Sequence, residues 1–249
     1  MSHFDPEKYS RLESPIHRWD PRAKVLSLVV LIFSVALAGD LLKAMAGLAV
    51  SFSLILISRL PLDHVVRFMK WPALFLLPFV IILPFTTGEG PQYSISVLAA
   101  SAQGLYLGLL FFIRGIGAAL LALLIVGTAP FAVTIKALQD MGLPGSLTQI
   151  FLFAYRYVFL LGEELETMSR SMDSKGFIKR SDFRTARILA MALAMLLIRS
   201  YERSENVFLS MLSRGYTGTV RADRRSKISG NDILKSLLVV GAAIGIQAL

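Results

Sequence analysis

The sequence contains no cysteine, few histidines and few charged residues. The absence of cysteine excludes a disulfide scaffold, thiol catalysis and thiolate metal sites. His3, His17 and His64 lie too far apart in the sequence to form a short metal-binding motif, so we expect no metal site in this chain. Only 17% of the residues are charged, against about 25% in an average globular chain, whereas 55% are hydrophobic. A lipid bilayer is the environment that accommodates such an excess of apolar residues.

Catalytic motifs are also missing from the sequence. The segment Gly142–Thr148 contains glycines but lacks the lysine of a G-x-x-x-x-G-K-[S/T] phosphate loop. No pair of carboxylates and no Ser/His/Asp combination has a credible spacing for catalysis. We therefore predict that the chain is not an enzyme and has no cofactor of its own.

The positive charge is concentrated in a few segments. The 26 Lys and Arg exceed the 17 Asp and Glu by nine, and 14 of the 26 lie within Arg156–Lys227. Within Trp71–Ala129, by contrast, the only charged residues are Glu89 and Arg114. Basic segments separated by long apolar ones are typical of the cytoplasmic loops of membrane proteins. The pattern favours membrane lipid as a partner and argues against nucleic acid.

The apolar segments predict five membrane spans, with the N-terminus in the cytoplasm. The 33 residues of Val25–Ile57 are too long for one crossing of a hydrocarbon core of roughly 30 Å, and Gly39-Asp40 near the middle predicts two short spans instead. The loop Thr86–Ser101 contains no Lys or Arg, which places it outside the cell. The three remaining spans are Trp71–Phe85, Tyr106–Val126 and Ser236–Leu249.

Arg114 lies in the middle of a predicted span. A charge at this depth is costly and commonly marks a transport pathway. The structural alternative is that the guanidinium pairs with carbonyl groups at a helix end inside the bundle. We favour the structural role, because no acidic partner is present within the spans.

The segment from Pro130 onward predicts a different kind of module. A short helix covers Phe131–Met141, and two long amphipathic helices follow it. The first long helix is predicted to start at a capping box, Ser146–Gln149, and to run to Lys175; the second runs from the N-cap Asp182 to Arg214. The expected fold is therefore an all-α integral membrane protein with about five transmembrane helices, one short helix and two long crossing amphipathic helices. Its parts are residues 1–129 (N-terminal cytoplasmic segment and four spans), 130–230 (cytoplasmic or interfacial module) and 231–249 (last span).

The two long helices end in the same sequence pattern. Ser171–Phe177 and Ser210–Tyr216 both read S-M-x-S-[K/R]-G-[F/Y], at a spacing of 39 residues. A basic residue and a glycine at one helix end are explained by capping. Two copies of a longer pattern favour docking to a partner with two similar anionic sockets, such as a two-fold dimer. The predicted docking residues are Ser174, Lys175, Gly176, Phe177, Ser213, Arg214, Gly215 and Tyr216.

These residues resemble the transmembrane T component of energy-coupling factor (ECF) transporters, of the cobalt/nickel type called CbiQ. The resemblance covers nearly the whole chain, and it is carried by Ser14–Lys24, Arg156–Glu164, Arg199–Glu205 and Met211–Tyr216. In that family two long coupling helices cross beneath the membrane, and Ala-Arg-Gly-type motifs at their ends dock into two ATPase subunits. Ser213-Arg214-Gly215 is close to the motif. Ser174-Lys175-Gly176 departs from it, because lysine cannot form a planar bidentate pair with a carboxylate.

The resemblance implies the partners and the function. The implied partners are two CbiO-like ATPases and a CbiM-like membrane subunit that captures the substrate. A small accessory membrane subunit is a further partner that the resemblance allows. ATP and the metal ion would be handled by these subunits, and the chain would couple them without catalysis in a bacterial or archaeal plasma membrane. Charged residues of the two long helices would support the coupling: Arg156, Glu163, Glu166, Arg199, Glu202, Arg203 and Glu205.

Other functions stay open at this point. A T component of a vitamin-type ECF transporter has the same helices, because a separate subunit selects the substrate. A self-contained secondary permease needs polar groups deep in the spans, of which there are few besides Arg114. A membrane enzyme that holds an acidic lipid headgroup is the remotest alternative. The sequence does not separate cobalt from nickel, nor show whether the two ATPases are identical.

Overall fold

The chain folds into helices that are grouped in two compact units. The computed structural model describes residues 14–86, 92–95, 98–178, 180–218 and 229–249. One unit is formed by Met1–Ala137 with Ser226–Leu249, and the other by Leu138–Arg225. The elements of the first unit are α1 (Pro21–Ala36), α2 (Leu41–Ser58), α3 (Leu62–Thr86), β1 (Gln92–Ile95), β2 (Leu98–Ser101), α4 (Ala102–Gly127) and α8 (Gly230–Ala248). The short helix α5 (Phe131–Asp140) spans the boundary, and the second unit contains α6 (Gly145–Ser174) and α7 (Phe183–Ser213).

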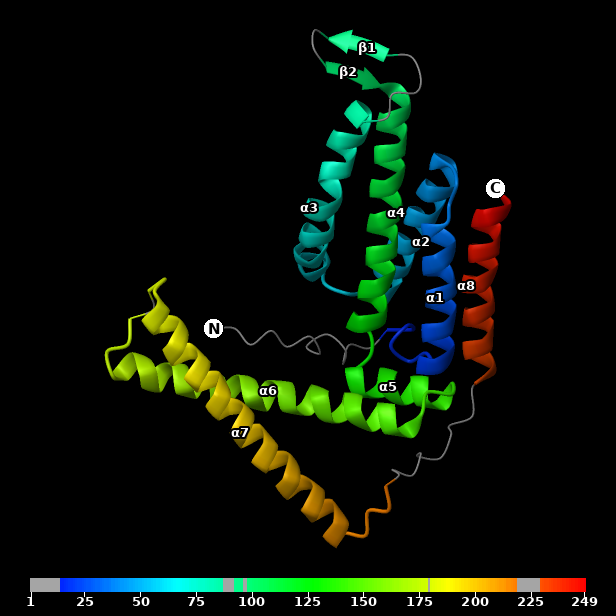
Figure 1. Ribbon diagram of the computed structural model, residues 1–249. Coiled ribbons are helices and arrows are strands. Elements are labelled where there is room, and N and C mark those ends of the chain that lie inside the picture. Colours follow the sequence, from blue (N-terminus) through cyan, green and yellow to red (C-terminus); the bar gives the residue numbers. More distant parts are fainter. Residues whose placement is uncertain (1–13, 87–91, 96–97, 179, 219–228) are drawn as a thin grey trace. The chain divides into compact units, whose positions relative to one another are not determined.

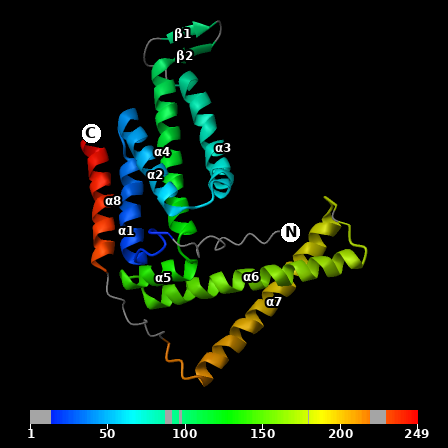
Figure 2. The ribbon, with the colours of Figure 1, turned by 180° about the vertical axis from the view of Figure 1, so that it is seen from behind.

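In the first unit, helix α4 packs against α1, α2 and α3, and α8 packs against α1 (Figures 1 and 2). Their shared core contains Leu28 and Leu31 of α1, Ile55 of α2, and Leu121 and Leu124 of α4, all at most 1% exposed. Large apolar side chains cover much of the outer surface as well. A bundle that is apolar both inside and outside is the expected form of a membrane-spanning unit.

The described part of the chain contains four helices that are long and apolar enough to cross a bilayer, namely α2, α3, α4 and α8. The fifth predicted span corresponds to α1, whose 16 residues extend about 24 Å and fall short of a core of roughly 30 Å. The predicted break at Gly39-Asp40 is confirmed, because α1 ends at Ala36 and α2 begins at Leu41. The span predicted to begin at Trp71 lies within α3, which begins nine residues earlier. Charged residues lower the hydropathy of the segment before Trp71, but lysine and arginine still favour a helical conformation.

The predicted outside loop contains a short β-hairpin that the sequence interpretation missed. Strands β1 and β2 pair antiparallel, with Gln92 opposite Ser101 and Ile95 opposite Leu98. A single two-stranded hairpin is a small addition to the all-helical fold (Figure 1).

Arg114 makes the helix-end contact that the structural interpretation predicts, although its Nε is buried without a hydrogen-bond partner among the described residues. Its Nη1 donates to the carbonyl oxygen of Ala36, the last residue of α1, at 3.4 Å. The guanidinium also lies 5.7 Å from the centre of the Phe111 ring. The negative end of a helix dipole and an aromatic face both stabilise a cation. Arg114 therefore ties α4 to the end of α1.

The segment before α1 and the first turn of α1 contact the start of α8 and the end of α4. The buried Lys24 donates from Nζ to the carbonyl oxygen of Thr128 at 3.2 Å and to its Oγ1 at 3.1 Å. Trp19 is also buried, and its Nε1 donates to the carbonyl oxygen of Asp232 at 3.2 Å. In the opposite direction, Nζ of Lys235 donates to the carbonyl oxygen of Pro15 at 3.1 Å. The segment Ser14–Lys24, which carries part of the family resemblance, thus has a structural role at this end of the bundle.

In the second unit, helices α6 and α7 cross each other, as Figures 1 and 2 both show. The predicted capping box Ser146–Gln149 is wrong, because α6 begins at Gly145 with Pro144 as its N-cap. Proline has a fixed φ and no N–H, and it can stand at a helix start without a side-chain cap. The predicted cap of α7 is confirmed, since Oδ1 of Asp182 accepts from the Thr185 N–H at 2.7 Å. The hydrogen bonds with Thr185 hold the pKa of the Asp182 carboxyl below its ordinary value.

Candidate functional site: two basic helix tips and a helix crossing

The C-terminal tip of α6 is closed by two backbone hydrogen bonds. The N–H of Phe177 donates to the carbonyl oxygen of Met172 at 3.1 Å, and the N–H of Gly176 donates to that of Asp173 at 3.0 Å. Gly176 has a φ of +77°, a conformation that favours glycine. This is the Schellman motif, with Lys175 at the C-cap.

The tip of α7 has the same geometry. The backbone N–H of Tyr216 donates to the carbonyl oxygen of Met211 at 3.0 Å, and the N–H of Gly215 donates to that of Leu212 at 2.9 Å. Gly215 has a φ of +80°. Arg214 is the C-cap. Capping therefore accounts for the glycine and for the backbone bonds of the methionine and the aromatic residue in each copy. It leaves the basic side chain as the group that each tip presents.

Both basic side chains are available to a partner. Lys175 and Arg214 are exposed, and neither forms an ion pair with a described residue. The serines beside them are already bonded to their own helices: Ser174 Oγ donates to the carbonyl oxygen of Arg170 at 2.6 Å, and Ser213 Oγ to that of Ser210 at 2.9 Å. Within the described part of the chain, each tip therefore presents an exposed cation without an ion-pair partner at a capped helix end.

The two tips differ in their surroundings. At the first tip, Lys175 lines a cavity of about 430 Å³ together with two further cations, Arg180 and Arg184, and one carboxylate, Asp182. At the second tip, Tyr216 donates its hydroxyl proton to Oε1 of Gln149 at 2.7 Å. Gln149 lies near the start of α6, so this bond connects the end of α7 to the beginning of α6.

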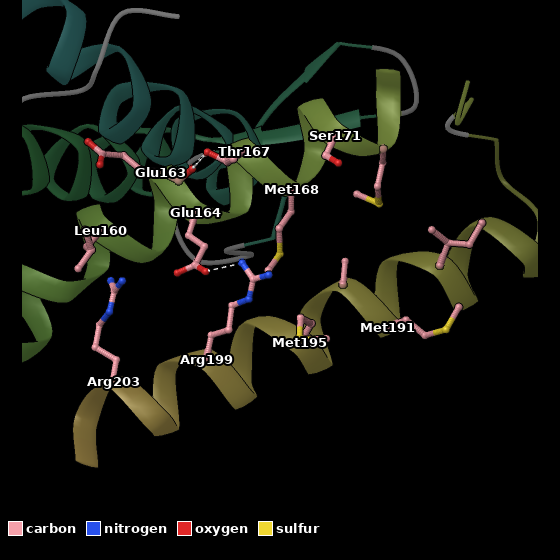
Figure 3. A pocket seen from close by; sticks show the side chains of 13 residues that line it. Leu160, Glu163, Glu164, Thr167, Met168, Ser171, Met191, Met195, Arg199 and Arg203 are labelled. Carbon is pink, nitrogen blue, oxygen red and sulfur yellow. Dashed lines mark hydrogen bonds and ion pairs between the residues drawn. The ribbon is translucent and has the colours of Figure 1, made fainter. Parts of the chain in front are cut away.

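An ion pair connects α6 and α7 where they cross. Nη1 of Arg199 lies 2.8 Å from Oε1 of Glu164, and Figure 3 shows the two side chains pointing toward each other. One turn further along α7, Arg203 points toward Leu160, and its Nη1 is buried without a hydrogen-bond partner among the described residues (Figure 3). The cavity beside this pair has a volume of about 710 Å³ and is lined by four methionines, Met168, Met172, Met191 and Met195.

The predicted supporting residues divide into three groups. Arg199 forms the crossing pair, and Glu163 and Arg203 line the cavity beside it. Glu166 pairs with Arg170 on its own helix at 2.6 Å. The exposed residues Arg156, Glu202 and Glu205 do not join the crossing pair, although Glu202 lines a smaller cavity next to it.

The structure also identifies two residues that were not among the predicted sites, Glu164 and Gln149. Glu164 belongs to the segment Arg156–Glu164, and its place in the family-like sequence was the available signal. No local pattern points to the pairing of Glu164 with Arg199 or of Gln149 with Tyr216, because each pair joins different helices.

A large apolar surface accompanies the crossing. On α7, six large apolar residues between positions 189 and 198 are 39–69% exposed, and on α6 Val158 and Phe159 are 63% and 45% exposed. Contiguous exposed apolar surface marks a protein or membrane contact. Helices α6 and α7 therefore present both cationic ends and apolar sides to other molecules.

Comparison with known proteins gives a consistent picture. Residues 13–226 match the family model CbiQ, described as a cobalt transport protein. The chain is 28% identical to the energy-coupling factor transporter transmembrane protein EcfT of Heliobacterium modesticaldum, over 95% of this chain and 94% of that protein. It is 25% identical to EcfT of Bacillus subtilis, over 95% of both chains. An uncharacterized protein of Methanocaldococcus jannaschii is 26% identical over 91% of this chain and 80% of its own length.

The family match covers most of the chain, including both helix tips and the crossing. The T component is a multi-pass membrane protein without catalytic activity, and it works in a complex with ATPases and a substrate-binding component. With this fold and these matches, the chain belongs to the CbiQ family and is the transmembrane T component of an ECF transporter.

Proposed function

We propose that Lys175 and Arg214 dock this T component onto two CbiO-like ATPase subunits. The observation that supports this most directly is the shared geometry of the tips: at each one an exposed cation is the C-cap residue of a Schellman motif and forms no ion pair with a described residue. Acidic residues on the ATPases would pair with the two cations. Arg214 can form a bidentate pair with a carboxylate, whereas Lys175 provides a single ammonium group.

The crossing would transmit the movement of the ATPases. When ATP changes the distance between the two subunits, each tip moves with its socket, and the helices move as rigid elements. The Arg199–Glu164 pair and the Tyr216–Gln149 hydrogen bond would make α6 and α7 move together. A methionine-lined contact suits such motion, because methionine side chains adapt to changing shapes.

The cargo in this proposal is divalent cobalt or nickel. The description of the matching family supports it, and a CbiM-like subunit in contact with the apolar surface of α6 and α7 would capture the ion. A small accessory membrane subunit can complete the complex. ATP and the ion would bind the partners, so the T component needs no cofactor. In this arrangement the N-terminus lies in the cytoplasm of a bacterial or archaeal cell, and the complex lies in the plasma membrane.

The docking is tested by reversing the charge of one tip. In the complex purified from membranes in detergent, Arg214→Glu should release the ATPases, measured as the ratio of ATPase to T component in a pull-down. Lys136→Glu is the control, because Lys136 is an exposed cation of α5 and lies at neither tip. Full ATPase binding together with ATP-driven uptake by Arg214→Glu would contradict the proposal.

The cargo is tested in the same preparation. Elemental analysis of the co-purified complex and uptake of cobalt, nickel and B vitamins into proteoliposomes compare the two types of transporter. Uptake of a vitamin without uptake of either metal would support the vitamin-type T component instead.

A further inference from the structure

A groove on the membrane unit lies outside the site described so far. It has a volume of about 930 Å³ and lies between α2, α3 and α4. Met45 and Phe52 of α2, Ala73 of α3, and Ile116 and Leu120 of α4 are among its lining residues. The lining is apolar apart from two residues, so the groove suits a hydrocarbon chain.

The two exceptions are both cations. Arg67 and Lys70 lie three residues apart on α3, which places them on the same side of the helix. Both are exposed, and neither forms an ion pair with a described residue. The groove therefore combines an apolar channel with two unpaired positive charges near the N-terminal end of α3.

We propose that this groove binds one anionic phospholipid, with an acyl chain against α2 and α4 and the phosphate on Arg67 and Lys70. A guanidinium and an ammonium on one face can both donate hydrogen bonds to the oxygens of one negatively charged phosphate. On α3 the lining extends from Val65 to Ala73, or about 12 Å along the helix, long enough for part of an acyl chain. Basic pockets between membrane helices on the cytoplasmic side bind acidic headgroups, and that leaflet is rich in them. The lipid would fill the space between α3 and α2 and fix the start of α3.

Native mass spectrometry of the full chain tests the proposal. The chain is purified in a mild detergent, stripped of lipid and incubated with phosphatidylglycerol or with phosphatidylcholine. One phosphatidylglycerol should stay bound, at about tenfold or more above phosphatidylcholine. The double variant Arg67→Ala/Lys70→Ala should lose this preference. The variant Arg67→Lys/Lys70→Arg should keep it, because both charges remain.

Matched variants separate the groove from the general surface. Ala49→Trp places a bulky ring in the groove with both charges intact and should reduce the bound lipid. Leu238→Trp is its control, because Leu238 is 64% exposed on α8 and does not line the groove. Arg184→Ala/Arg187→Ala removes two charges from α7 instead and should leave lipid binding unchanged.

Two results would overturn the proposal. One is equal retention of phosphatidylglycerol by the native chain and by Arg67→Ala/Lys70→Ala. The other is a photoreactive residue at position 52 that attaches to another subunit of the assembled transporter and not to lipid, since the groove would then be a protein contact. Neither result concerns ATPase docking, so the lipid site and the proposed function are tested separately.

Discussion

At the scale of single residues, the two helix tips present different cations on the same backbone. Gly176 and Gly215 have nearly equal φ values, and both tips have the same pair of backbone hydrogen bonds. The difference between them therefore comes from the side chains. Lys175 lines a cavity with Arg180, Arg184 and Asp182, whereas Arg214 lies beside the Tyr216–Gln149 bond.

This comparison predicts the effect of substitutions at Lys175. Lys175→Arg should bind the ATPases as well as the native chain or more tightly, because a guanidinium can form two parallel hydrogen bonds with a carboxylate. Lys175→Ala should weaken binding, measured as ATPase retained per T component in a detergent pull-down. Lys136→Ala, which removes an exposed lysine charge from α5, is the control and should change nothing. Unchanged retention by Lys175→Ala would exclude the first tip from docking.

At the scale of elements, the ion pair between α6 and α7 is expected to matter more for movement than for stability. The Arg199 side chain is 51% exposed and that of Glu164 19% exposed, so the pair contributes only about 0.2–1 kcal/mol to the free energy of unfolding. Arg199→Glu and Glu164→Arg should each reduce ATP-driven uptake, and the double swap should restore much of it. Arg170→Ala, which breaks the pair within α6, is the control. A double swap no better than the single variants would show that the pair does not couple the helices.

The contact between α3 and α4 depends on a glycine. A Cβ at Gly108 would lie 2.9 Å from the Cα of Val80 and 3.1 Å from the carbonyl oxygen of Phe79, so the two backbones meet directly. Gly108→Ala should lower the free energy of unfolding by about 1–3 kcal/mol, as overpacking does. Gly241→Ala on α8 has open space around it and should not destabilise. Thermal unfolding in detergent compares the two; equal midpoints would contradict the tight contact.

At the scale of the whole molecule, the T component is expected to depend on its partners for transport. In proteoliposomes, the purified chain alone should take up neither cobalt nor nickel, with or without ATP. Adding the ATPases and the capture subunit should start uptake, and it should stop without ATP. Uptake by the chain alone down a metal gradient would instead support a secondary permease.

Much of the fold and the candidate site follows from the sequence, because the signals are local. The excess of apolar residues and the segmented charge determine a membrane protein. The cap at Asp182 determines where α7 begins, and the glycines at positions 176 and 215 determine where α6 and α7 end. The repeated pattern around Lys175 and Arg214 identifies both tips as candidate sites. Each of these signals acts within a few residues of the chain, where capping and hydropathy operate.

Only the tertiary structure determines which distant residues meet. It places Arg199 against Glu164, Tyr216 against Gln149 and Arg114 against the end of α1, and it brings Arg67 and Lys70 to the groove beside α2 and α4. It also shows α6 starting at Pro144 rather than at the predicted Ser146 cap. These contacts join helices that are far apart in the sequence, and their geometry depends on how whole helices pack, which no local pattern encodes.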